Sequence, residues 1–150
     1  WEKLKSKSLD EINDNQPIIM GFDNFNEMII ASRNNVNNVF PNNNCKISFK
    51  DFFDLEPPIE NPLLILNPPY NIRIAQEKTQ LFYEKIGSRL KHTWSESDAW
   101  LLSGDLESLK HIGLRPKRRI KLYNGPIETK LVHIPLYRGS KKTKKQPKIE

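Results

Sequence analysis

Residues 63–66 are four consecutive large aliphatic residues, Leu-Leu-Ile-Leu, and they lead directly into Asn67, Pro68, Pro69 and Tyr70. A short continuous apolar run of this kind is typical of a strand buried on both faces, as in the middle of a parallel sheet. The two prolines end the strand, because proline fixes φ and lacks the N–H that a sheet ladder needs. The sequence therefore predicts that Asn67 and Tyr70 lie just beyond the carboxyl end of a central strand, where open α/β sheets hold their ligands.

The side chains after this strand suit a flat molecule that carries an amine. The Asn67 side-chain carbonyl accepts hydrogen bonds, and the Pro68 carbonyl offers a second acceptor. Two acceptors match a planar amine with two N–H donors, and Tyr70 offers a ring face on which a base can stack. The alternative interpretation of the same four residues is a proline-rich turn that follows a core strand.

Strands and helices are expected to alternate along the rest of the chain. Further strands are predicted at residues 17–23, 46–49 and 99–103, and helices at about 24–38, 81–90 and 105–111. Asn24 and Glu27 form a capping-box pattern at the start of the first of these helices. Two strand-like runs, 119–123 and 129–136, flank Asn124-Gly125, which is the strongest short-range signal for a hairpin. The pattern predicts an α/β fold with a mostly parallel sheet and a C-terminal antiparallel hairpin.

The charge of the chain is concentrated at its C-terminal end. The net charge is +6, and residues 138–150 hold six basic residues against one acidic, which leaves 18 basic and 17 acidic residues in the rest. We therefore expect a nearly neutral body at residues 1–137 and a basic flexible tail at 138–150, which either only solubilises the protein or contacts phosphates. A single Cys45, three scattered histidines and no long apolar run predict a cytoplasmic protein without disulfides, metal or membrane spans.

These features together resemble the Rossmann-like fold of S-adenosylmethionine-dependent methyltransferases, from the second strand of that fold onward. More narrowly, the chain resembles the THUMP-domain-containing ribosomal RNA guanine-N2 methyltransferases, a family often described as adenine-specific DNA methylases. The resemblance covers about residues 18–138. The residues that carry it are Gly21-Phe22-Asp23, Lys50-Asp51, Asn67-Pro68-Pro69-Tyr70, Arg73 and the 123–127 hairpin.

The resemblance implies roles for particular residues. S-adenosyl-L-methionine would be bound by Asp23, which accepts hydrogen bonds from the ribose hydroxyls, with Asn24 beside it. Asp51 would accept from the adenine amino group, with Phe52 packing near the ring. The target amine and base would be held by Asn67, Pro68, Pro69, Tyr70 and Arg73, with Asn67, Pro68 and Tyr70 in the catalytic role. Asn67 would also contact the cofactor. From the residues alone, Asp23 is equally well explained as a helix cap, and Asp54 competes with Asp51.

Two departures from the family pattern leave alternatives open. The family has a glycine-rich loop after its first strand, whereas Gly21 is the only glycine here before Gly87. We expect that strand and loop upstream of Trp1 in the same polypeptide, or lost. The family also continues its tetrapeptide with Gly-Glu-Arg, whereas this chain has Asn71-Ile72-Arg73. The expected function is methyl transfer to an exocyclic amine of guanine in ribosomal RNA. The alternatives are methylation of DNA adenine or of a protein glutamine amide, or an inactive RNA-binding remnant.

Overall fold

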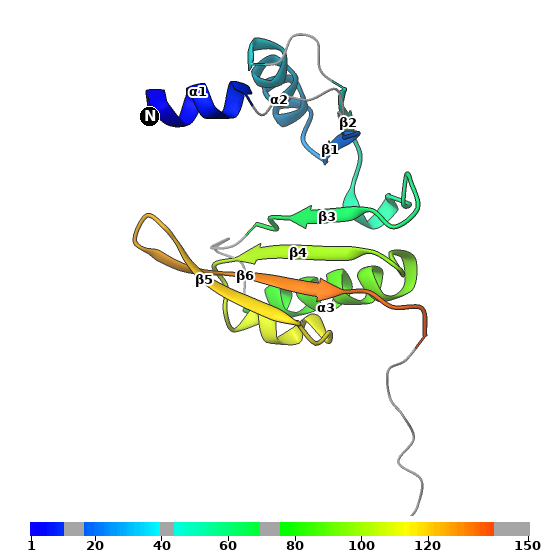
Figure 1. Ribbon diagram of the computed structural model, residues 1–150. Helices are drawn as coiled ribbons and strands as arrows, with labels where there is room; N and C mark the ends of the chain where they lie inside the picture. Colours follow the sequence, from blue (N-terminus) through cyan, green and yellow to red (C-terminus); the bar gives the residue numbers. More distant parts are fainter. Residues whose placement is uncertain (11–16, 40–43, 70–75, 140–150) are drawn as a thin grey trace, which may run out of the picture. The chain divides into compact units, whose positions relative to one another are not determined.

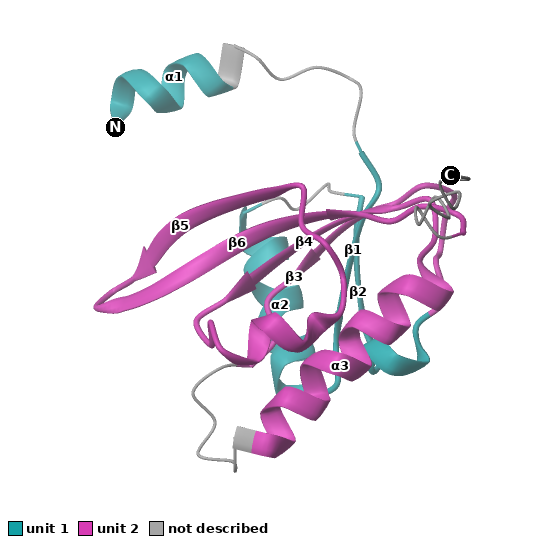
Figure 2. Cartoon of the chain, turned by 90° about the horizontal axis from the view of Figure 1, so that it is seen from below, with its two compact units in different colours: residues 1–55 teal, residues 56–150 magenta. Residues whose placement is uncertain are grey.

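The computed structural model of the protein describes residues 1–10, 17–39, 44–69 and 76–139. The chain divides into two compact units, Trp1–Leu55 and Glu56–Glu150, which Figure 2 shows in different colours. The first unit contains α1 (Glu2–Asp10), β1 (Ile19–Asp23), α2 (Asn26–Val39), β2 (Cys45–Phe49) and the short 3₁₀-helix η1 (Phe52–Asp54). The second contains β3 (Leu63–Leu66), α3 (Gln76–Thr93), β4 (Asp98–Ser103), the 3₁₀-helix η2 (Ser108–Ile112), β5 (Arg118–Asn124) and β6 (Ile127–Pro135) (Figure 1).

The first unit is a strand–helix–strand arrangement. Strands β1 and β2 pair in parallel, from Ile19 opposite Cys45 to Asp23 opposite Phe49. Helix α2 connects them and buries Ile29, which is 2% exposed. Its Arg33 guanidinium donates to the Ile47 carbonyl with N–O distances of 3.0 and 2.7 Å, which ties the helix to β2. Parallel pairing places the carboxyl ends of both strands at the same edge of the small sheet.

The second unit is a four-stranded mixed sheet in the order β3-β4-β6-β5. Strand β3 pairs with β4 in parallel, whereas β6 pairs antiparallel with both β4 and β5. Helix α3 packs on one face of this sheet (Figure 1), and the core of the unit includes the fully buried residues Tyr83, Leu90, Ala99, Leu101 and Val132. The predicted α/β fold with a C-terminal antiparallel hairpin is confirmed, and the sheet of this unit is mixed, with one parallel and two antiparallel strand pairs.

The prediction that residues 63–66 are buried on both faces is wrong for one face. Leu64 is 7% exposed, but Leu63 is 64% and Ile65 76% exposed. Strand β3 is an outer strand of the four-stranded sheet, and the exposure of its side chains depends on what covers each face. Because side chains alternate along a strand, α3 covers only the face that carries Leu64, and no described helix of the second unit covers the other.

The predicted hairpin is confirmed, but its turn lies one residue later than the Asn-Gly signal suggests. Asn124 pairs with Ile127 as the last rung of the β5–β6 ladder, so Gly125 and Pro126 are the two central residues of the turn. Gly125 has a φ of 59°, a conformation that glycine adopts without steric cost.

Helix α3 approaches η2 so closely that one helical position must be glycine. A Cβ atom built on Gly87 would lie 1.7 Å from the Ile112 carbonyl oxygen. Ile112 itself is 4% exposed, and Gly113 ends η2 in a left-handed conformation with φ 66°. The backbone of η2 therefore fills the space that any larger side chain would need.

We expect Gly87→Ala to lower the free energy of unfolding by at least about 2 kcal/mol, because overpacking a close backbone contact outweighs the helix propensity gained, which is about 1 kcal/mol. Chemical denaturation of the intact protein measures this. The control is Ser88→Ala at the next, exposed position of α3, which should change stability by less than about 0.5 kcal/mol. A Gly87→Ala protein as stable as the unchanged one would show that α3 and η2 lie farther apart.

Candidate functional site

The predicted cofactor residues of the first unit lie together at the carboxyl ends of β1 and β2. Asp23 is the last residue of β1. The Lys50 N–H donates to the Asp23 carbonyl at 2.9 Å, which extends the pairing beyond β2 and places Asp51 next to the end of β1. The Asn24 amide then donates to Asp51 Oδ2 at 2.9 Å. Asp23, Asn24 and Asp51 therefore form one cluster, although 27 residues separate Asn24 from Asp51.

Asp23 also stabilises the turn into α2. Its Oδ1 accepts from the Phe25 N–H at 2.8 Å, while its second oxygen accepts no hydrogen bond from the described residues. The capping box predicted for Asn24 and Glu27 is wrong, because α2 begins at Asn26 and the Asn24 amide is directed to Asp51. The cap interpretation and the ribose interpretation of Asp23 are compatible, since a carboxylate has about four lone-pair sites and one is used here.

Asp51 is held more firmly than Asp54, its competitor in the sequence. Asp51 Oδ1 accepts from the Phe53 N–H at 2.8 Å and caps η1, while Oδ2 accepts from Asn24. The Asp54 side chain is exposed and has no hydrogen bond or ion pair with the described residues. Phe52 follows Asp51 and is half-buried, edge-on to Phe53 with ring centroids 5.6 Å apart. This cluster is rich in acceptors and has an aromatic ring beside it, which fits a ribose and an adenine amino group.

Asn67 and Pro68 follow β3 in the second unit. Asn67 is exposed and Pro68 is buried. Within the described ranges of the chain, no group donates a hydrogen bond to the Asn67 side chain or to the Pro68 carbonyl. The parallel pairing of Leu66 with Leu101 fixes the end of β3, so both acceptors start from a rigid strand. Pro69 is exposed next to them, whereas Tyr70 and Arg73 lie outside the described residues, and their roles stay predictions.

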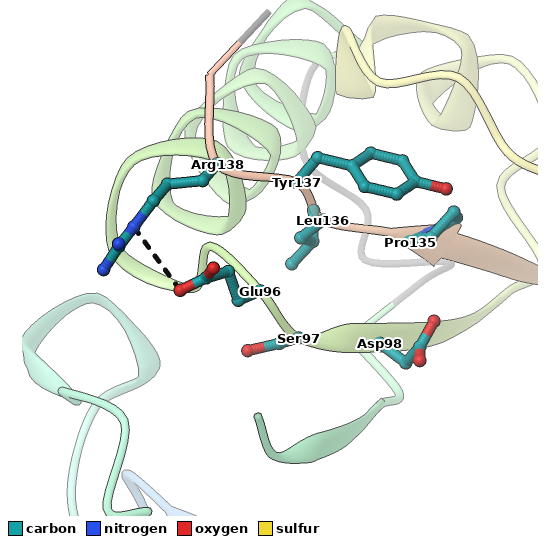
Figure 3. Close-up of a pocket in the computed structure, with 7 residues that line it drawn as sticks. All are labelled: Glu96, Ser97, Asp98, Pro135, Leu136, Tyr137 and Arg138. Atoms are coloured by element: carbon teal, nitrogen blue, oxygen red, sulfur yellow. Dashed lines mark ion pairs between the residues drawn. The ribbon is translucent and has the colours of Figure 1, made fainter. Parts of the chain in front are cut away.

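A shallow hollow of about 390 Å³ lies at a different place (Figure 3). Its lining residues come from the start of β4 and from the end of β6 onward: Glu96, Ser97, Asp98, Pro135, Leu136, Tyr137 and Arg138. Since β3 and β4 are parallel, the start of β4 is at the opposite end of the sheet from Asn67. Its charged side chains also already have partners, because Arg138 pairs with Glu96 at 3.4 Å and His133 Nε2 is hydrogen-bonded to Asp98 Oδ1 at 2.6 Å. The hollow is not part of the predicted site.

No residue pattern indicated the contact between Asn24 and Asp51. Both residues were candidates for the cofactor, but their mutual hydrogen bond depends on the parallel register of β1 and β2, which residue patterns do not specify. The described residues contain no group of three or more His, Cys, Asp and Glu side chains that could hold a metal ion. Within the same residues, no helix has the length and apolar character needed to cross a membrane.

The alternation of strands and helices, the parallel strands and the polar residues at their carboxyl ends define a Rossmann-like α/β fold of the methyltransferase type. Residues 1–133 match the family described as RMKL-like, methyltransferase domain. The chain therefore belongs to this family of methyltransferase domains, and the family predicted from the sequence is confirmed.

Individual relatives agree with this assignment. The chain is 34% identical over 129 residues to a proposed RNA methyltransferase of Synechocystis sp., covering 81% of this chain and 32% of the relative. It is 29% identical over 153 residues to the ribosomal RNA large subunit methyltransferase K/L of Legionella pneumophila, covering 94% of this chain and 20% of the relative. The crystal structure of a proposed methyltransferase complexed with S-adenosylhomocysteine aligns with a TM-score of 0.77 at 22% identity, over 93% of this chain and 37% of that one. At that identity the likeness shows the fold, and the chain spans between 20% and 37% of each of these proteins.

We expect Asp51→Ala to lower the free energy of unfolding by about 1–2 kcal/mol, because it removes both the cap of η1 and the partner of the Asn24 amide. Asp54→Ala should cost less than about 0.5 kcal/mol. Denaturant titrations of both variants of the intact protein provide the comparison. Equal costs for the two substitutions would contradict the arrangement described for Asp51.

Proposed function

We propose that the protein transfers the methyl group of S-adenosyl-L-methionine to an exocyclic amine of a guanine base in ribosomal RNA. The observation that carries the proposal is the pair of acceptors after β3. Asn67 and Pro68 directly follow a strand fixed by parallel pairing, and no described residue uses their oxygens. Membership in the methyltransferase family supports the reaction, and the name of the Legionella relative supports ribosomal RNA as the substrate.

The two acceptors address the main difficulty of the reaction. An exocyclic amine donates its lone pair into the base ring, so it is a poor nucleophile. If Asn67 and Pro68 accept hydrogen bonds from its two N–H groups, these bonds favour a pyramidal geometry at the amine nitrogen. The lone pair of that nitrogen is then directed to the methyl carbon. Positioning of this kind, together with preorganised dipoles, lowers the barrier without a strong base. Tyr70 would stack on the base, and Pro69 and Arg73 would contact the substrate.

The cofactor would be held by the cluster at the ends of β1 and β2. When bound, it supplies an electrophilic methyl group. Asp23 has an unused carboxylate oxygen for the ribose hydroxyls, and Asp51, oriented by Asn24 and by η1, has lone pairs left for the adenine amino group. Phe52 would pack beside the ring. We place this activity in the cytoplasm.

We expect Asn67→Ala to slow methyl transfer by about 100-fold or more, the scale seen when one preorganised polar contact to a transition state is removed. Stability should change by only about 1 kcal/mol, because Asn67 is exposed, and cofactor affinity should change much less than the rate. Single-turnover transfer to ribosomal RNA by the full-length protein, with thermal melts of each variant, measures this.

The control for Asn67→Ala is Asn34→Ala, an exposed asparagine of α2, which should leave transfer unchanged. If Asn67→Ala folds normally and still transfers methyl groups at a near-normal rate, residues 67–70 are only a turn, and the proposed reaction loses its main support.

A further inference from the structure

Strand β5 and the segment before it carry positive charges, most of which have no acidic partner among the described residues. Residues 113–127 hold five basic residues and no acidic one: Arg115, Lys117, Arg118, Arg119 and Lys121. Only Lys121 has a partner among the described residues, since its ammonium lies 2.6 Å from Glu128 and 5.4 Å from the centre of the Tyr123 ring. Its hydrogen bonds, first to Glu128 and then to Tyr123, hold the pKa of the Lys121 ammonium above its usual value.

The other four basic side chains occupy positions 115, 117, 118 and 119 and are all exposed. We call these four residues the β5 cation group. No side chain of this group has a hydrogen bond or ion pair with the described parts of the chain. The backbone N–H of Lys117 donates to the His133 carbonyl at 2.8 Å. Like charges at this spacing repel one another. An anionic partner would remove that repulsion.

The position of β5 relates this group to Asn67. In the ladders of the second unit, Leu66 pairs with Leu101, Leu101 with Val132, and Val132 with Arg119. Arg119 is therefore level with Leu66, the residue before Asn67. The two residues are three strand spacings apart across the sheet, which is about 14 Å at ~4.8 Å per spacing. Consecutive phosphates of one strand are about 3.4 Å apart along a helix axis, so up to about four nucleotides cover this distance.

The edge position makes the cations accessible. Strand β5 is an outer strand of the sheet, and successive side chains point to opposite faces, so Arg118 and Arg119 line both sides of this edge. Tyr123, 65% exposed, continues the strand beyond the level of Asn67 and offers a ring for stacking. Interleaved cations and an exposed aromatic ring are typical of surfaces that bind single-stranded nucleic acid.

We infer that the β5 cation group binds the phosphate backbone of the RNA substrate, a few nucleotides away from the base held at Asn67. This inference rests on the proposed function for the identity of the substrate. The alternative explanation for charges on an outer strand is that they prevent edge-to-edge pairing between molecules. That explanation predicts no change in RNA binding when the charges are removed.

The test measures how RNA affinity depends on salt for the full-length protein and two charge-matched double variants. Arg118→Gln with Arg119→Gln removes two members of the group, and Lys85→Gln with Lys91→Gln removes two exposed lysines of α3. The probe is a short fluorescein-labelled single-stranded RNA, and fluorescence anisotropy gives the affinity. For the arginine pair, the slope of log affinity against log salt should flatten by about 1.4, which is ~0.7 per phosphate contact, and binding should weaken about tenfold or more. The lysine pair should keep the slope of the unchanged protein.

An unchanged slope for the arginine pair, or equal changes for both pairs, would overturn the inference. If Arg118→Gln with Arg119→Gln does not fold, Arg115→Gln with Lys117→Gln, in the segment before β5, should flatten the slope by the same amount. A DNA probe of the same sequence that competes equally well would overturn RNA as the specific occupant.

If the proposed function is wrong but the inference about the β5 cation group is right, RNA binding and methyl transfer give different results. The unchanged protein would then bind RNA through the β5 cation group but transfer no methyl group to it. Conversely, the arginine pair should retain the single-turnover rate at saturating RNA, because the charges act in binding. A loss of rate at saturation would contradict a role confined to the phosphate backbone.

Discussion

The parallel pairing of β3 with β4 is the constraint on which the second unit depends. It joins Leu64 and Leu66 to Ala99 and Leu101 in one register, and it presents their apolar side chains to α3. The close contact of Gly87 with η2 then fixes the helix. Because the end of β3 is set in this way, Asn67 and Pro68 leave the sheet from a rigid position. A site that depends on two accurately placed acceptors needs that rigidity, since small displacements of reacting groups reduce rates strongly.

The first unit also depends on a parallel strand pair, but the side chains at the ends of its strands are carboxylates. Parallel pairing of β1 with β2 brings Asp23 and Asp51 to one edge, and the Asn24 amide connects the second carboxylate to the turn after β1. The carboxylates serve local structure as well, because each accepts a backbone N–H two residues further along the chain. A carboxylate that is already oriented by the fold loses less freedom when a ligand binds to it. The structural and the proposed binding roles of these residues therefore support each other.

The sequence predicted the fold class correctly because its strongest signals are local. The aliphatic run at 63–66 identified β3, and Asn124-Gly125 identified the terminal hairpin. The exposure of Leu63 and Ile65 could not be predicted, since it depends on which elements cover the second face of the sheet. The turn at Gly125-Pro126 was misplaced by one residue because asparagine also fits the last rung of a ladder. The contact between Asn24 and Asp51 required a long-range register. The roles of Asp23, Asn24, Asp51, Phe52 and of residues 67–70 and 73 remain predictions.

In the proposed reaction, Asn67 and Pro68 present two acceptors to an exocyclic amine of guanine. The most direct measurement incubates the full-length protein with labelled S-adenosylmethionine and ribosomal RNA transcribed without modifications, and then identifies the labelled nucleoside. The account predicts that the label appears on the N2 nitrogen of guanosine. Label on adenosine, transfer to DNA or protein in preference to RNA, or no transfer at all would contradict it.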